Sequence, residues 1–176
     1  MPWFTKKSPE SSPDQFPGLK PAKGLKVAPL LSDSVVLFPP PGQDKMNVLE
    51  DLVAAVCLKA GRTDSAVFLA KALEREQGIS TTLDTGLSLP HARVDGIDSI
   101  LAGMAVLKTP IADPKQADLQ IRVVFLFFSP NKQDAFPLHL QLLRGVSSLF
   151  QPSLIDQLTA APGPAEALAL VRKIEG

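Results

Sequence analysis

The sequence has one cysteine, two histidines and no tyrosine in 176 residues, and neither sign of charge is in excess. Without a second cysteine, Cys57 cannot form a disulfide within the chain, which favours a reducing compartment and an inert core thiol. The 18 basic and 18 acidic side chains balance, so no overall field attracts nucleic acid or an anionic membrane. The longest apolar runs, residues 100–107 and 123–128, are far shorter than the roughly 20 residues of a membrane span. We therefore expect a cytoplasmic protein with no nucleic-acid partner and no membrane insertion.

Residues 1–28 differ in composition from the rest of the chain. They carry five prolines, several serines and a mild excess of lysine, with few aliphatic side chains. Such a segment buries too little apolar surface to offset the entropy lost on ordering, so it is predicted to be a flexible tail. The alternative is a docking arm anchored by Trp3 and Phe4. Residues 29–176 have the length and apolar content of one domain with a single core.

Strand and helix patterns alternate along residues 29–176. Near-continuous apolar or alternating segments predict strands at residues 34–38, 80–83, 86–89, 99–107 and 119–128. Capping residues and helical periodicity predict helices at residues 44–60, 64–75, 137–149, 152–160 and 164–175. This mixture predicts an α/β fold in which one central mixed sheet of about five strands lies between layers of helices.

His91 lies in the segment Gly86-Leu87-Ser88-Leu89-Pro90-His91-Ala92. The alternation before Pro90 is typical of a half-buried strand, and proline has no N–H to continue the ladder. His91 is therefore expected on a short turn just past a strand end, where ligand-binding groups gather in α/β folds. His139, the other histidine, follows the strongest strand pattern of the chain. Each histidine alone is more often structural, but their positions suggest that the two meet.

Several chemistries are open to such a pair. Two histidines without companion cysteine or glutamate ligands at short spacing do not form a zinc signature, and no cofactor motif is present. A Ser–His–Asp site from Ser88, His91 and Asp84 lacks the second glycine of a nucleophile elbow. A neutral imidazole can instead accept a phosphoryl group, with His139 and Arg75 as candidate groups that stabilise it.

Four segments together resemble a known family. They are Leu73-Glu74-Arg75-Glu76 with Ser80-Thr81, the His91 segment, the apolar run 123–128 followed by Pro130, and His139-Leu140-Gln141-Leu142-Leu143. In this order they resemble enzyme IIA of the phosphoenolpyruvate-dependent sugar phosphotransferase system, specifically the fructose/mannitol class that includes the nitrogen-regulatory IIA proteins. The resemblance covers residues 29–174.

The resemblance implies a phosphotransferase component and a role for each site residue. His91 would accept a phosphoryl group from the histidine-containing phosphocarrier protein and pass it to a cysteine of an enzyme IIB, or hold it as a regulatory signal. His139 would stabilise the phosphoryl group by hydrogen bonding, and Arg75 would offset its charge. The alternative implied by the same family is a regulatory domain that acts through phosphorylation-dependent protein binding without sugar flux.

The chain departs from the family in one loop. The family has about "TGIGNG" where this sequence has Thr81-Thr82-Leu83-Asp84-Thr85-Gly86. A carboxylate close to an anion site opposes phosphorylation, so Asp84 must point away from His91 or reduce its reactivity.

Overall fold

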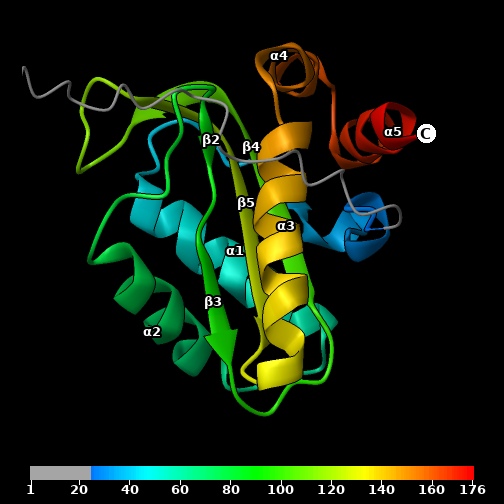
Figure 1. Ribbon diagram of the computed structural model, residues 1–176. Coiled ribbons are helices and arrows are strands. Elements are labelled where there is room, and N and C mark those ends of the chain that lie inside the picture. The colour runs from blue at the N-terminus through cyan, green and yellow to red at the C-terminus, as the bar shows by residue number, and fades with distance from the viewer. Residues whose placement is uncertain (1–24) are drawn as a thin grey trace, which may run out of the picture.

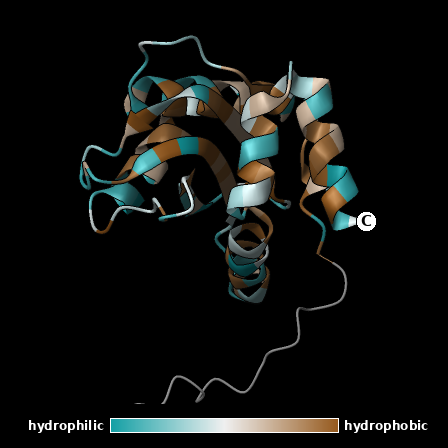
Figure 2. Ribbon diagram, turned by 90° about the horizontal axis from the view of Figure 1, so that it is seen from above, coloured by the Kyte–Doolittle hydropathy of each residue, from teal (hydrophilic) through white to brown (hydrophobic). Residues whose placement is uncertain are grey.

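Two long antiparallel strands form the centre of the sheet in the computed structural model, which describes residues 25–176. They are β4 (Leu101–Ala112) and β5 (Gln120–Pro130). The side chains of Val123 to Phe128 are all essentially inaccessible to solvent, because helices cover both faces of β5. Figure 2 shows the apolar residues concentrated along these central strands.

Three short strands pair with this central hairpin. β1 (Val36–Leu37) is parallel to β4, while β2 (Leu87–Ser88) and β3 (His91–Val94) are both parallel to β5. The strand order is β1-β4-β5-β2, with β3 further along the same edge of β5. The sheet is therefore mixed and five-stranded, as the sequence predicts.

Five α-helices surround the sheet, α1 behind it and α3 in front in the view of Figure 1. They begin and end within two residues of the predicted limits. The observed bounds are α1 (Lys45–Lys59), α2 (Ser65–Glu76), α3 (Phe136–Leu149), α4 (Pro152–Ala160) and α5 (Pro164–Glu175). Three short 3-10 helices, Ala28–Leu30, Asp33–Val35 and Gln133–Ala135, complete the elements of residues 25–176.

α1 packs against β4 with no room for a side chain at Gly103. Asp44 caps the helix by accepting the backbone N–H of Asn47 at 2.8 Å, which sets where the helix begins. At Gly103 of β4, a Cβ would lie 2.6 Å from Val56 and 2.9 Å from Leu52. Glycine is required here because any side chain would force the helix away from the sheet.

The strand predictions need four corrections. The strand predicted at 34–38 is limited to Val36–Leu37, because residues 33–35 form a 3-10 helix. β3 is not predicted, because Pro90 indicates the end of a strand; the chain resumes pairing with β5 one residue later. β4 and β5 extend to Ala112 and Pro130, beyond the predicted ends at 107 and 128. The strand predicted at 80–83 is reduced to a single bridge between Thr82 and Ser88.

The packed structure begins before residue 29. Val27 and Ala28 are buried, and the Glu175 carboxylate at the end of α5 accepts their backbone N–H groups at 2.5 and 2.7 Å. These two residues fall within the predicted tail but belong to the core. The rest of that tail, with Trp3 and Phe4, lies outside the described residues apart from Leu25 and Lys26.

Cys57 lies on the buried face of α1. Burial raises the pKa of its thiol, Asp64 raises it further, and Arg62 opposes the change. A buried thiol with a raised pKa is unreactive, as expected for a core cysteine.

Candidate functional site

The fold brings the two histidines together. The ring centroids of His91, in β3, and His139, in α3, lie 5.4 Å apart. Phe127 of β5 completes an aromatic cluster, stacked on His91 at 5.5 Å and tilted against His139 at 5.3 Å. Each histidine retains 6% of its accessible surface, so the pair lies just beneath the protein surface.

The backbone around Pro90 orients the His91 ring. His91 is the first residue of β3, opposite Phe127, and not on a turn beyond the sheet as the sequence suggests. Pro90 cannot donate to the ladder, but its carbonyl accepts the N–H of Phe127 at 3.2 Å, so the chain remains on the edge of β5. The Nδ1 atom of His91 lies 2.7 Å from the carbonyl oxygen of Leu89. A carbonyl only accepts hydrogen bonds, so Nδ1 carries the proton and Nε2 keeps its lone pair.

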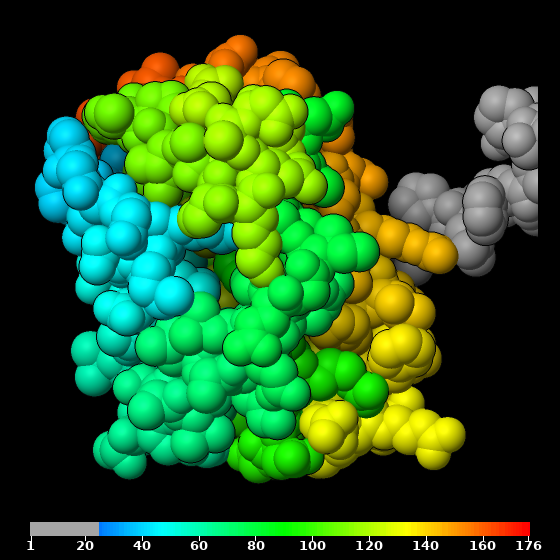
Figure 3. Space-filling model, turned by 90° about the vertical axis from the view of Figure 1, so that its left-hand side faces the viewer, coloured from blue at the N-terminus to red at the C-terminus, as the bar shows by residue number. Residues whose placement is uncertain are grey.

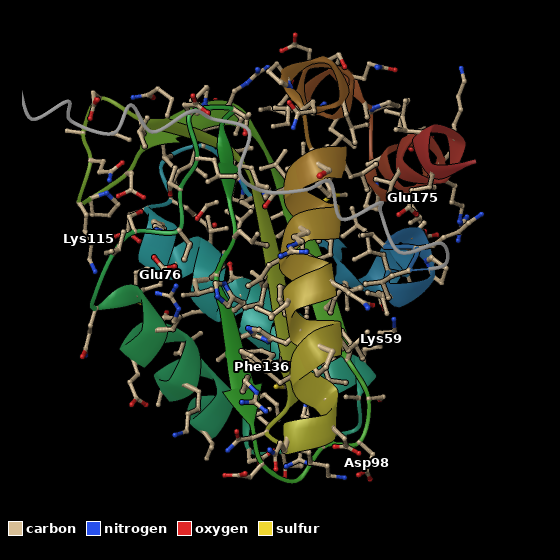
Figure 4. The ribbon with its side chains drawn as sticks, viewed as in Figure 1. Lys59, Glu76, Asp98, Lys115, Phe136 and Glu175 are labelled. Carbon is tan, nitrogen blue, oxygen red and sulfur yellow. The ribbon has the colours of Figure 1, made fainter. Side chains whose placement is uncertain are left out.

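His139 lies in the first turns of α3, against the end of β5. Its Nδ1 atom is 2.6 Å from the hydroxyl oxygen of Ser129, which is completely buried. Phe136 of the same helix stacks nearly parallel to the imidazole, at 6.3 Å and 11°. Figure 4 shows Phe136 between β3 and the N-terminal part of α3.

Both imidazoles are held in their neutral forms. Burial lowers the pKa of His91; the hydrogen bond to Leu89 opposes the shift, the charge of Arg75 adds to it and that of Glu76 opposes it. Burial also lowers the pKa of His139 to about 4, helped by electrostatic coupling to His91, Arg93 and Arg75, since a proton on His139 would repel a proton on His91 and the two guanidiniums. A neutral His91 has the lone pair that a nucleophile needs.

Two arginines act electrostatically on the histidine pair: Arg75 lowers the pKa of both rings, and Arg93 lowers that of His139. Arg75 is exposed in the last turn of α2, and its guanidinium makes no hydrogen bond or ion pair with any residue of 25–176. Arg93 of β3 lies over the Phe136 ring at 5.0 Å and donates to the carbonyl of Lys132 at 2.6 Å. Its Nε–H is buried without a partner in the described part of the chain. Guanidinium groups are well suited to bind phosphate oxygens.

Glu76, and not Asp84, is the carboxylate whose charge raises the pKa of His91. Asp84 is exposed in the turn between Leu83 and Gly86, and it is not among the groups that shift the pKa of His91. Glu76 is buried, and it accepts hydrogen bonds from Lys45 at 2.9 Å and from the Thr81 hydroxyl. The Asp84 turn precedes β2, where Leu87 pairs with Val123, whereas His91 pairs with Phe127 further along β5. This register separates Asp84 from the imidazole along the sheet, the first of the two possibilities drawn from the sequence.

A buried carboxylate anchors the loop that departs from the family pattern. Asp113, after β4, accepts hydrogen bonds from Ser80 at 2.8 Å, from Thr82, from Lys45 at 3.1 Å and from the N–H of Lys115 at 2.8 Å. Burial opposes its ionisation, but these hydrogen bonds outweigh burial and hold the pKa of this carboxyl well below its usual range. The hydroxyls of Thr81 and Thr82 thus find partners in Glu76 and Asp113.

Metal binding and Ser–His–Asp chemistry are the alternatives for the histidine pair. In residues 25–176, no group of three or more His, Cys, Asp or Glu side chains is arranged to hold a metal ion. The hydroxyl of Ser88 is buried without a hydrogen-bond partner in the same residues, and His91 is oriented by Leu89 and not by Asp84. Ser88, His91 and Asp84 therefore lack the hydrogen bonds that link the three residues of a Ser–His–Asp site.

A cavity of about 460 Å³ lies between α1, α2 and the segment that follows β4. It is visible as a hollow in Figure 3. Its lining residues are Lys45, Met46, Leu49, Leu73, Glu76, Gln77, Pro114 and Lys115. Neither histidine contributes to it, so the imidazole pair lies outside this hollow.

None of the helices in residues 25–176 is long and apolar enough to cross a bilayer.

Residues 29–174 match the family described as "Phosphoenolpyruvate-dependent sugar phosphotransferase system, EIIA 2". The chain belongs to this family. It is 26% identical over 145 residues to a nitrogen regulatory protein of Pseudomonas aeruginosa, covering 82% of this chain and 92% of that protein. A nitrogen regulatory protein of Bradyrhizobium diazoefficiens is 24% identical over 144 residues, with the same coverage.

Solved structures show the same fold. The nitrogen regulatory protein IIA-Ntr of Neisseria meningitidis superposes with a TM-score of 0.71 at 20% identity, over 82% of this chain and 98% of that one. The mannitol IIA of Escherichia coli gives 0.66 at 18% identity, over 80% and 98%. An NMR structure of the Escherichia coli complex of mannitol IIA with phosphorylated mannitol IIB gives 0.64 at 15% identity, over 81% and 97%.

The sequence does not predict the contacts that four residues make around the histidines: Glu76, Arg93, Phe127 and Ser129. Ser129 is a polar residue at the end of an apolar strand, which is a weak signal for a buried hydrogen bond. Glu76 lies next to Arg75, but nothing in the sequence indicates that it is buried. Their roles depend on contacts between distant segments.

Proposed function

We propose that this chain is a phosphocarrier in which Nε2 of His91 accepts and releases a phosphoryl group. The observation that carries the proposal is the Nδ1···O contact between His91 and Leu89, which leaves Nε2 with its lone pair. The neighbouring groups suit a phosphoryl dianion, because Arg75 and Arg93 are cationic and His139 is a neutral ring that can donate through Nε2.

The transfer needs no cofactor. The His91 Nε2 lone pair attacks the phosphorus of a phosphohistidine on the histidine-containing phosphocarrier protein. A bond from Nε2 to phosphorus forms, the bond from the donor nitrogen to phosphorus breaks, and the donor nitrogen keeps the electron pair. The His91 proton stays on Nδ1, in its hydrogen bond to the Leu89 carbonyl. Catalysis then consists of positioning and charge stabilisation.

The fate of the phosphoryl group defines two variants of this function. In the first, the thiolate of an enzyme IIB cysteine attacks the phosphorus, and Nε2 regains its lone pair; the similarity in fold to the mannitol IIA of the IIA–IIB complex supports it. In the second, phosphorylated His91 is a signal that changes binding to a regulatory target. The two nitrogen regulatory relatives support the second variant.

Reconstitution tests the proposal directly. The full chain is incubated with phosphoenolpyruvate, enzyme I and the phosphocarrier protein, and its intact mass is measured. We expect one added phosphoryl group that is labile in acid and stable in base, and no addition in His91→Ala. An acid-stable adduct, or an adduct that persists in His91→Ala, contradicts the proposal. Adding an enzyme IIB then separates the variants, because loss of label from His91 to IIB indicates transport.

A further inference from the structure

Ser129 and His139 form a buried hydrogen bond whose direction can be assigned. The hydroxyl oxygen of Ser129 lies 2.6 Å from Nδ1 of His139, and the serine is completely inaccessible to solvent. No other hydrogen bond involves the Ser129 side chain within residues 25–176. A serine hydroxyl has one proton to donate, and a neutral imidazole has one N–H and one lone pair.

Only one direction satisfies the buried hydroxyl of Ser129. If Nδ1 of His139 carried the proton, it would donate to Ser129, and the buried hydroxyl proton of Ser129 would have no acceptor among the described residues. If Ser129 donates to Nδ1, the hydroxyl proton and the Nδ1 lone pair satisfy each other. The Nε2–H of His139 is not among the buried side-chain atoms without a partner, so this arrangement leaves no buried donor unpaired in the pair. Buried donors without acceptors are costly, so the second arrangement is favoured.

We propose that Ser129 is a positioning residue: it donates to Nδ1 of His139 and so keeps the imidazole proton on Nε2. The value of this tautomer for phosphoryl transfer rests on the proposed function. His91 and His139 would then have opposite tautomers, His91 with a free lone pair on Nε2 and His139 with a proton there. The first suits a nucleophile and the second a donor to phosphoryl oxygens.

The placement of Ser129 supports this role. Side chains two apart on a strand share a face, so Phe127 and Ser129 of β5 both face α3. Phe127 stacks on His91, and Ser129 holds His139, so one strand end fixes both rings. The neutral state of His139, with its pKa near 4, keeps Nδ1 available as an acceptor at neutral pH.

The first test is independent of activity. The chain has two histidines, so long-range ¹H–¹⁵N spectra of the untagged protein, with His91→Ala for assignment, resolve each ring. Above the ordinary histidine pKa of about 6.5, we expect His139 protonated on Nε2 and His91 on Nδ1. A proton on Nδ1 of His139 would overturn the proposal, whether or not the protein accepts phosphate.

The second test uses transfer rates from the phosphocarrier protein. Ser129→Ala should slow phosphorylation of His91 about 3- to 10-fold, the scale for one lost hydrogen bond. The same substitution in a His139→Ala background should change the rate less than about twofold, because the effect acts through His139. Equal slowing in both backgrounds, or no slowing in either, overturns the positioning role.

Ser88→Ala is the matched control. Ser88 is also completely buried on a strand beside β5, but its hydroxyl has no hydrogen-bond partner in residues 25–176. Its removal should leave the transfer rate and the His139 spectrum unchanged. If the wild-type chain accepts no phosphoryl group at all, the proposed function fails, while the spectrum still decides the tautomer.

Discussion

The imidazoles of His91 and His139 lie 5.4 Å apart, and each makes its hydrogen bond through Nδ1. The partner of His91 is a carbonyl, and the partner of His139 is a hydroxyl. Both Nε2 atoms are therefore left for a ligand placed at the pair. A phosphoryl group on one ring would lie within reach of the other, with Arg75 acting electrostatically on both.

Arg75→Ala is expected to slow phosphorylation of His91 by about 10- to 1,000-fold, the range for losing one donor to a charged transition state. The fold should be unaffected, because the Arg75 side chain is exposed and bonds to no described residue. Transfer rates and thermal melts measure the two effects. Arg172→Ala, which removes an exposed arginine from the last turn of α5, is the control. Equal rates in both variants would show that Arg75 does not act on the phosphoryl group.

The stability of the protein should fall as the pH decreases from about 6.5 towards 4. In this window the unfolded chain binds a proton at His139, while the folded chain, with a pKa of about 4, does not. The contribution of His139 to the free energy of unfolding therefore rises with pH and is level above about pH 7. Urea titrations of wild type and His139→Gln should show that the variant loses about 1–3 kcal/mol less across the window. Parallel curves for the two proteins would mean that His139 titrates normally.

Asp84→Asn should change the rate of His91 phosphorylation less than about twofold, the scale of an exposed charge far from the reacting group. Asp84 is exposed and does not shift the pKa of His91, whereas Glu76 does. Phosphorylation kinetics at low and moderate ionic strength measure the effect. A tenfold acceleration in Asp84→Asn would place this carboxylate close to the phosphoryl group and contradict the geometry.

Gly103→Ala should lower the free energy of unfolding by about 1–3 kcal/mol, the usual cost of overpacking a core. The added Cβ would lie 2.6 Å from Val56 and 2.9 Å from Leu52, so α1 must move away from β4. Gly145→Ala in α3 is the matched control, because nothing lies within 4 Å of its added Cβ. That change should stabilise the helix by about 0.5–1 kcal/mol. Chemical denaturation of both variants separates a steric effect from a general intolerance of alanine.

The sequence predicts elements well where local chemistry determines them. α4 and α5 are predicted to the residue, because Pro152 and Pro164 suit the first turn of a helix and mark where each begins. β3 is missed because Pro90 indicates a strand end, although only its N–H is lost and its carbonyl still pairs with Phe127. The proximity of His91 and His139 follows from strand ends that meet in α/β folds. The Ser129 and Glu76 contacts cannot be predicted, because they join residues brought together only by the three-dimensional packing.

Removal of the first 23 residues should leave both stability and phosphorylation unchanged. The segment has five prolines and few aliphatic side chains, and the first proposed site residue along the chain is Arg75. A chain starting at Gly24 keeps Val27 and Ala28 bonded to Glu175, so its core contacts are intact. We expect the free energy of unfolding to change by less than about 0.5 kcal/mol, as for changes away from packed features. Thermal melts and transfer rates of the two chains distinguish the outcomes. A docking arm built on Trp3 and Phe4 would leave the melting temperature unchanged but weaken a partner complex, whereas a large fall in melting temperature would show that the segment packs on the core.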